Sequence, residues 1–280
     1  MRSRRIIEKI FRIACFSMAF LGIAVLAILL YTILREGLPW LAPHFLTNFP
    51  SRKATQAGIY AAIWGSVWIM CLTALISVPV GIATAFYLEE YMPEGKFSDL
   101  VQVNIATLAG MPSIIYGLVG LTVFVRAFGM GKSVLAGALT LSLLILPVIV
   151  ISAQGAIRAV PRTLRDAAYA LGARKWQVTL GQVLPAAASG IMTGIILALS
   201  RAMGETAPLI LIGALSYVAF VPESMNDSFT VLPVQIFNWA GRPSADFHGL
   251  AAAGIIVLMV FLFILNLVAI VIRERAQRYK

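Results

Sequence analysis

Charged side chains are scarce in this sequence. Asp, Glu, Lys and Arg together make up 12% of the 280 residues, about half the share that is usual in a soluble globular domain. Hydrophobic residues make up 60%, and the mean hydropathy is +0.90. Too few polar side chains are available to cover a water-exposed surface. This composition excludes an ordinary soluble protein and predicts a polytopic membrane protein.

Cysteine and histidine are also rare, with two residues of each. Cys15 and Cys71 lie in apolar runs without CxxC spacing, which argues against a disulfide or a metal site. His44 and His248 lie outside the apolar runs, and neither HExxH nor GxSxG occurs. We therefore expect no metal site and no catalytic residues of an intramembrane hydrolase.

Six apolar runs are long enough to cross the membrane, since about 20 helical residues span about 30 Å of hydrocarbon. They predict an all-α protein with transmembrane helices in residues 13–34, 59–88, 101–125, 134–157, 183–221 and 250–272. The fifth run is too long for one straight crossing, and Gly204 and Pro208 are expected to break it. The first run is too long for a signal peptide and lacks a cleavage site, so we expect a retained helix.

Lys and Arg are distributed unevenly between the two sides that six spans define. Fifteen lie on the side of the two termini and six on the other side, while Arg201 lies inside a span. Because Lys and Arg are retained beside cytoplasmic helix ends, both termini, 1–12 and 273–280, are expected in the cytoplasm. Segments 35–58 and 222–249 are then periplasmic. The same asymmetry accounts for the formal net charge of +10 without a nucleic-acid partner.

Residues 126–133, RAFGMGKS, end like a phosphate-binding P-loop. The motif needs glycine where Arg126 stands, and a preceding strand where an apolar helix is expected. The segment also falls on the side opposite the termini, away from cytoplasmic ATP. We expect no nucleotide site in this chain, so any ATP hydrolysis belongs to a partner.

The long cytoplasmic segment 158–182 is predicted to contain one short amphipathic helix. Pro161 suits its first turn and Gly172 the residue after its end. Leu164, Ala168 and Leu171 fall at i, i+4 and i+7 and form an apolar stripe. The remaining surface is expected to carry Arg162, Arg165, Asp166 and Tyr169, with Arg162 and Asp166 spaced as an i,i+4 pair. So short a helix needs lipid or another protein to lie on.

Residues 166–185, DAAYALGARKWQVTLGQVLP, resemble the EAA loop of ABC importer permeases, E-A-A-x3-G-x9-I-x-L-P. The matching positions are Asp166, Ala167, Ala168, Gly172, Leu184 and Pro185. Asp166 replaces Glu and Gln182 replaces an apolar residue, but the spacing is kept. The stretches NIATLAGMPSIIYGLVGL, SGIMTGIILALSRAMGETAPLI and LPVQIFNW are similar to the PstA-type permease family of phosphate-specific ABC importers. This likeness extends from about residue 55 to residue 275.

The resemblance implies a type I ABC importer permease fold and a transport subunit that is not an enzyme. It implies that this chain forms half of a translocation pathway for inorganic phosphate across the bacterial inner membrane. A second, PstC-like permease, a PstB-like ATPase dimer that binds ATP and Mg, and a PstS-like phosphate-binding protein would complete the importer. The short cytoplasmic helix would be the coupling helix that docks on the ATPase. Residues implied in this coupling are Arg162, Leu164, Arg165, Asp166, Ala167, Ala168, Leu171 and Gly172.

Arg201 and Glu205 lie deep inside the fifth apolar run, where an unpaired charge costs about 2.5 to 3.5 kcal/mol on insertion scales. At i,i+4 they can pair, and a pair that only holds helices together is one interpretation. Gly204 and Pro208 loosen the backbone beside them, which is tolerated next to a water-filled cavity. We therefore favour a polar substrate pathway, which would include Thr206. The guanidinium fork fits phosphate oxygens, and the Glu205 carboxylate can accept the acidic proton of phosphate.

A second candidate lining of the pathway is GMPSIIYG, residues 110–117. Pro112 leaves a carbonyl without its helical partner, and Ser113 and Tyr116 supply hydroxyl groups. A proline kink packed against neighbouring helices explains the same residues at least as well.

Two further functions stay open on the sequence. One is an ABC permease for a different oxyanion. The other is a proton-coupled secondary anion transporter, in which Glu205 carries protons and no ATPase takes part. Uptake by vesicles that lack the ATPase separates the last of these from an ABC importer.

Overall fold

The computed structural model describes residues 2–214 and 217–278, and the regular elements in these ranges are all helical. The helices are α1 (Arg2–Gly37), α2 (Pro43–Thr47), α3 (Tyr60–Phe86), α4 (Lys96–Ala109), α5 (Ser113–Gly120), α6 (Val134–Arg158), α7 (Arg162–Ala170), α8 (Lys175–Val178), α9 (Leu184–Met203), α10 (Ala207–Ile212), α11 (Leu232–Ala240) and α12 (Ala245–Arg278). The π-helical turns η3 (Tyr87–Tyr91), η4 (Leu121–Ala127) and η5 (Thr179–Val183) continue α3, α5 and α8. Short 3₁₀ turns, η1 (Leu38–Trp40) and η2 (Ala54–Gln56), flank α2.

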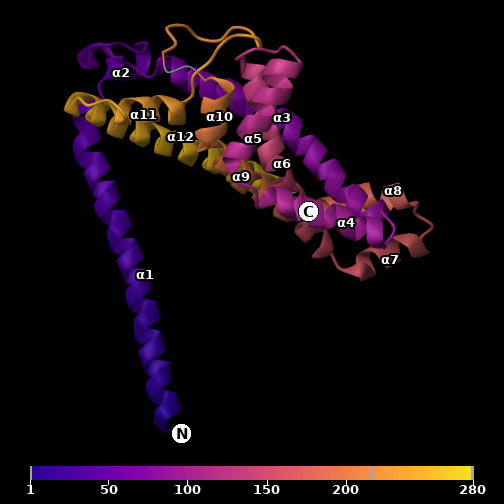
Figure 1. Cartoon of the computed structure of the whole chain (residues 1–280). Coiled ribbons are helices and arrows are strands. Elements are labelled where there is room, and N and C mark those ends of the chain that lie inside the picture. The colour runs from indigo at the N-terminus through magenta and orange to yellow at the C-terminus, as the bar shows by residue number, and fades with distance from the viewer. Residues whose placement is uncertain (1, 215–216, 279–280) are drawn as a thin grey trace.

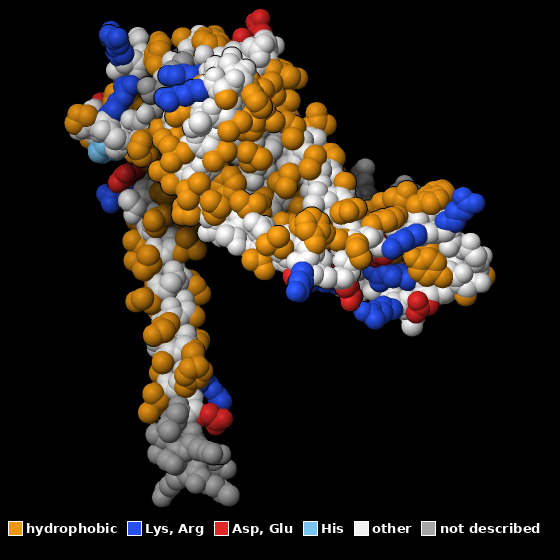
Figure 2. All heavy atoms as spheres, turned by 45° about the vertical axis from the view of Figure 1, so that its right-hand side comes forward, with side chains coloured by type: hydrophobic (Ala, Val, Ile, Leu, Met, Phe, Trp, Pro, Cys, Tyr) orange, Lys and Arg blue, Asp and Glu red, His pale blue; other side chains and the backbone are white. Residues whose placement is uncertain are grey.

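The described part of the chain contains five helical stretches that are long and apolar enough to cross a membrane. They are Glu8–Trp40, Tyr60–Tyr91, Val134–Arg158, Lys175–Met203 and Ala245–Glu274. Helices α4 and α5, with η4, make a sixth candidate, with a bend of 99° between its halves. On the face shown in Figure 2, hydrophobic side chains cover the body of the molecule, and charged side chains gather mainly at its ends. The predicted all-α, polytopic fold is confirmed.

The third predicted span, residues 101–125, differs from a single straight helix. Helix α4 ends at Ala109, and α5 begins at Ser113 with Pro112 as its N-cap. Pro112 has no backbone N–H to continue the ladder of α4, so the chain turns there. The Tyr116 hydroxyl of α5 donates a hydrogen bond of 2.8 Å to the Leu108 carbonyl of α4, which fixes the bend.

The fifth predicted span, residues 183–221, also differs in extent. Its helix begins earlier, at Lys175, and runs through η5 and α9 to Met203. Three residues, 204–206, separate α9 from α10, which ends where Gly213 takes a left-handed φ of 96°. Pro208 lies in the first turn of α10, where a missing N–H has no cost, and the break itself is at Gly204. Positions 215 and 216 of the predicted run lie outside the described residues.

Helix α6 lies at the centre of the bundle, between α3 and α9 (Figure 1). Small residues let the helix backbones approach: Gly81 of α3 faces Ile149, and Gly194 of α9 faces Ser152. The Thr73 hydroxyl also donates across to the Ala138 carbonyl at 3.3 Å. Close packing of small residues and hydrogen bonds from hydroxyl groups commonly join helices in lipid, because the hydrophobic effect does not drive helices together there.

Helix α1 extends away from this bundle (Figure 1). Its last residue, Gly37, packs against the backbone of Ala252 and Ala253 in α12. The apolar side chains along most of its length are exposed, among them Phe11, Phe16 and Leu26. In a membrane this surface meets lipid or another apolar helix.

Helix α5 approaches α10 closely at Gly117. A Cβ at this position would lie 2.7 Å from Pro208 Cα and 2.8 Å from Leu211 Cδ1. We expect Gly117→Ala to lower the free energy of unfolding by about 1–3 kcal/mol, because a packed backbone must move. Thermal unfolding in detergent measures this. The control is Gly155→Ala in α6, whose added Cβ meets nothing within 4 Å, and equal melting temperatures for the two variants would contradict the packing.

Candidate functional site

The intramembrane charges lie at the break between α9 and α10. Arg201 is in the last turn of α9, and Glu205 is in the non-helical link that follows. Arg201 Nε lies 3.6 Å from Glu205 Oε1, which is an ion pair but longer than a strong hydrogen bond. The predicted i,i+4 contact is therefore present. The guanidinium group of Arg201 still has N–H donors for a further partner.

Arg201 lies on the open face of α9. Its side chain is 46% exposed, whereas the Glu205 side chain is 16% exposed. Exposed positions of α9 form one stripe at helical spacing: Ala186, Gly190, Thr193, Leu197 and Arg201, followed by Gly204. A charged pair that only joined helices of this chain would be buried between them. The exposure of Arg201 favours a group that faces a pathway or a neighbouring subunit.

The two interrupted spans meet beside this pair. Helix α5 packs on α10 at Gly117 and Pro208. Thr206 is partly buried in the link, as is Ser113 at the start of α5. Tyr116 is buried, and its hydroxyl hydrogen is engaged by the Leu108 carbonyl. Its oxygen can still accept a hydrogen bond, so Tyr116 has a structural role and a limited capacity to line a path.

The second candidate region is α7 in the predicted coupling segment. Pro161 is its N-cap, and Gly172 follows its end with a left-handed φ of 80°. Leu164 and Ala168 are partly buried against the core, but Leu171 is 89% exposed and leaves the expected stripe. Exposed positions on α7 include Arg162, Asp166 and Ala167. The expected Arg162–Asp166 pair is not among the ion pairs of the described residues, which join Arg158 to Glu89, Arg165 to Glu90, and Arg201 to Glu205.

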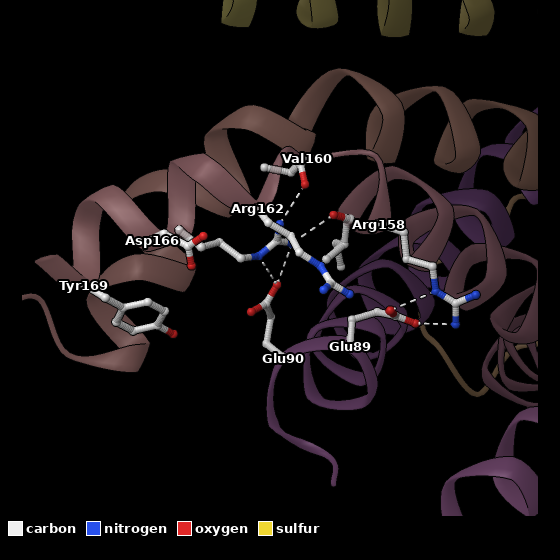
Figure 3. Close-up of a pocket in the computed structure, with 9 residues that line it drawn as sticks. Glu89, Glu90, Arg158, Val160, Arg162, Asp166 and Tyr169 are labelled. Carbon is white, nitrogen blue, oxygen red and sulfur yellow. Dashed lines mark hydrogen bonds and ion pairs between the residues drawn. The ribbon is translucent and has the colours of Figure 1, made fainter. Parts of the chain in front are cut away.

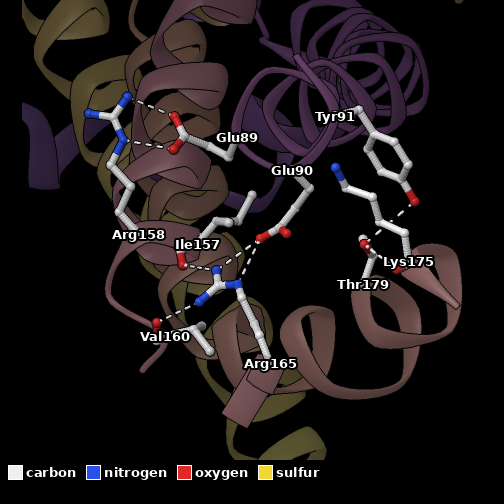
Figure 4. Close-up of polar contacts among 9 residues, drawn as sticks. All are labelled: Glu89, Glu90, Tyr91, Ile157, Arg158, Val160, Arg165, Lys175 and Thr179. Atoms are coloured by element: carbon white, nitrogen blue, oxygen red, sulfur yellow. Dashed lines mark hydrogen bonds and ion pairs between the residues drawn. The ribbon is translucent and has the colours of Figure 1, made fainter. Parts of the chain in front are cut away.

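Arg165 departs most from the expected position on the outer surface of α7. Its side chain is 16% exposed and points back to the membrane helices (Figure 4). Nε and Nη2 donate to Glu90 Oε1 at 3.1 and 2.8 Å. Nη1 donates to the Val160 carbonyl at 2.7 Å, and Nη2 also donates to the Ile157 carbonyl at 3.0 Å.

Sequence reasoning missed the acidic residues of η3. Glu89 receives hydrogen bonds of 2.8 and 2.7 Å from Arg158 and one of 2.8 Å from Gln154. Tyr91, two residues on, lies beneath the Lys175 ammonium group, 5.1 Å from the ring centre. A usable signal was present: two glutamates directly follow one long apolar run, and an arginine ends another.

A cavity of about 510 Å³ separates α7 from the ends of α3 and α6. Glu89, Glu90 and Arg158 border one side, and Arg162, Asp166 and Tyr169 of α7 border the other (Figure 3). Acidic and basic groups are balanced in this lining, so it does not select an anion. Within the described ranges, no group of three or more His, Cys, Asp or Glu is placed to hold a metal ion.

Known proteins are similar to this chain in sequence or in fold. The family described as "Binding-protein-dependent transport system inner membrane component" matches residues 77–278. The chain is 36% identical over 251 residues to the phosphate transport system permease protein PstA of Haemophilus influenzae, covering 88% of this chain and 86% of that one. It is 32% identical over 258 residues to the probable ABC transporter permease protein YqgI of Bacillus subtilis, covering 88% of each.

A solved structure supports the fold. A chain of a bacterial ABC transporter involved in the import of the polysaccharide alginate superposes with a TM-score of 0.68 at 17% identity, over 93% of this chain and 94% of that one. The helical topology, the EAA-like segment and the family match lead to the same assignment. The chain belongs to the binding-protein-dependent transport system inner membrane components, the permease subunits of ABC importers.

Proposed function

We propose that this chain is a permease subunit of an ATP-driven importer of inorganic phosphate and forms half of its translocation pathway. The observation that carries the proposal is the exposed Arg201, paired with Glu205 at a break in α9. It occurs in a chain whose relatives include permeases named for phosphate transport. Its own role is transport, and ATP hydrolysis belongs to a separate subunit.

The chemistry of the pair suits a protonated oxyanion. Arginine presents planar N–H donors that match two phosphate oxygens. A guanidinium is also more weakly hydrated than an ammonium, so less bound water has to be displaced when the anion binds. The Glu205 carboxylate can accept the proton that phosphate retains near pH 7, and it repels an anion without one. Thr206 and Ser113 offer hydroxyl groups close to the two breaks. Together these groups would admit phosphate and disfavour fully ionised anions.

The same proposal assigns positions to the other subunits of the importer. A second, similar permease would cover the open face of α9, and two ATPase subunits with bound ATP and Mg would meet α7. A phosphate-binding protein would deliver the anion at the opposite end, beside α2 and α11. This arrangement needs both chain termini in the cytoplasm and the protein in the inner membrane, which agrees with the excess of Lys and Arg on that side.

Membrane vesicles test the energy source. Vesicles with both permeases and the ATPase should take up phosphate only when ATP is present on the ATPase side. Vesicles without the ATPase should take up none, whatever the pH gradient. Uptake driven by a pH gradient alone would contradict the proposal and favour a secondary transporter that uses Glu205 as its proton carrier.

Glu205→Gln should change which anion the importer accepts. The amide keeps the shape of the side chain but no longer repels an ionised anion, so we expect uptake to depend less on pH and sulfate to compete better with phosphate. Uptake of labelled phosphate between pH 6 and pH 8, with and without sulfate, measures both effects. Glu223→Gln, at an exposed acidic residue outside the spans, is the control. If Glu205→Gln gives the parent profile, Glu205 serves only to hold Arg201.

A further inference from the structure

Helix α7 is joined to the membrane helices by few contacts. None of its nine residues is buried, and only Leu164, Arg165 and Ala168 are partly buried. The 510 Å³ cavity lies between α7 and the ends of α3 and α6. A nine-residue helix has little stability of its own. Its position therefore depends on the packing of Leu164 and Ala168 against the core, on its contacts with η5 and α8, and on the side chain of Arg165.

Arg165 connects three elements at one guanidinium group. Two of its four hydrogen bonds reach Glu90 in η3, the continuation of α3. The other two reach the carbonyls of Ile157 and Val160 at the end of α6. The charge complements the negative end of the α6 dipole as well as the carboxylate. The Glu90 side chain is 9% exposed and the Arg165 side chain 16% exposed, so only a small part of this contact faces water.

The helices that Arg165 contacts are connected by packing to the helix that carries Arg201. Helices α3 and α6 pack closely on each other, and α6 packs on α9, with the buried Gly194 facing Ser152. Arg201 is in the last turn of α9. Closely packed helices are poorly compressible, so a displacement of one is transmitted to its neighbours. A movement of α7 that is carried by Arg165 therefore reaches the helix that bears the candidate anion site.

We propose that Arg165 and Glu90 form the link by which a displacement of α7 moves α3 and α6, so that ATP hydrolysis is coupled to phosphate transport. This inference rests on the proposed function. Arg165 is then a positioning residue that acts inside the chain, and the contact with the ATPase falls to exposed neighbours on α7. Arg158 and Glu89 form a similar pair between α6 and η3 that does not include α7 (Figure 4).

The test measures phosphate transported per ATP hydrolysed by the complete transporter in proteoliposomes. Arg165→Lys keeps the charge but cannot make four bonds in fixed directions, and Glu90→Gln keeps the shape but loses the charge. Both variants are expected to lower the ratio roughly fivefold or more, the size of a typical coupling effect, while the ATPase stays bound. Arg158→Lys is the matched control and should keep the parent ratio, because its pair does not touch α7.

Three results would overturn the link. The first is that both variants keep the parent ratio of phosphate transported to ATP hydrolysed, and also the parent rates of transport and hydrolysis. The second is a proportional fall of transport and hydrolysis, because a purely structural residue lowers the amount of active complex and leaves the ratio unchanged. The third is loss of the ATPase from both variants, which would make the pair part of the docking surface. The proposed function fails differently: the parent complex itself would then transport no phosphate.

Discussion

Arg201→Lys is expected to reduce phosphate uptake by the assembled importer about ten- to hundredfold. Lysine keeps the positive charge but replaces a planar fork by a point donor, so one of two charge-assisted hydrogen bonds to the anion is lost, about 1.5–3 kcal/mol. The effect is expected in transport and in phosphate-stimulated ATP hydrolysis together. Uptake of labelled phosphate by proteoliposomes measures transport. Release of inorganic phosphate from ATP, at a fixed concentration of the transported anion, measures ATP hydrolysis.

The matched control for this substitution is Arg126→Lys. Arg126 is in η4, at the far end of the bent span, and contributes no ion pair among the described residues. Its replacement should leave uptake at the parent value. Parent kinetics for Arg201→Lys would remove Arg201 from the pathway and return the pair with Glu205 to a helix-holding role.

Deletion of residues 164–171 is expected to abolish binding of the ATPase while the chain still inserts in the membrane. The deletion removes most of α7 but none of the five long apolar stretches. Co-purification of the ATPase with the tagged permease should fall below detection, and the amount of permease in the membrane fraction should remain. Full recovery of the ATPase would show that docking occurs elsewhere.

A point substitution separates docking from folding in the same region. Leu171→Asp alters a side chain that is 89% exposed and has little contact with this chain. We expect it to weaken ATPase binding markedly without lowering the melting temperature of the isolated permease. Leu46→Asp, at an exposed leucine of α2 on the opposite side, should leave ATPase binding unchanged.

Much of the fold could be predicted because the membrane imposes simple rules on sequence. An apolar run of about 20 residues has to be helical in hydrocarbon, since no water is present to satisfy its backbone. Pro112 and Gly204 indicated where two spans would be interrupted, and both interruptions occur there. The size of the bend at Pro112 could not be read from the sequence, because it depends on tertiary contacts such as the hydrogen bond from the Tyr116 hydroxyl to the Leu108 carbonyl.

The coupling helix shows the limit of periodicity. The i, i+4, i+7 pattern placed Leu164, Ala168 and Leu171 on one apolar stripe that was expected to lie on lipid or another protein. Leu164 and Ala168 instead pack against the core of this chain, and Leu171 lies past the last residue of α7. Arg165 was expected on the outside because it is charged. It instead meets Glu90, 75 positions earlier in the chain, and such a partner cannot be inferred from a local pattern.

Phosphate import is tested most directly by measuring ATP hydrolysis by the complete transporter, reconstituted with its phosphate-binding protein, as phosphate is added. We expect hydrolysis that rises with phosphate, uptake that requires ATP, and a fall of about ten- to hundredfold in both for Arg201→Lys. Hydrolysis and uptake that follow a different anion and ignore phosphate, or phosphate uptake that proceeds without ATP, would contradict ATP-driven phosphate import.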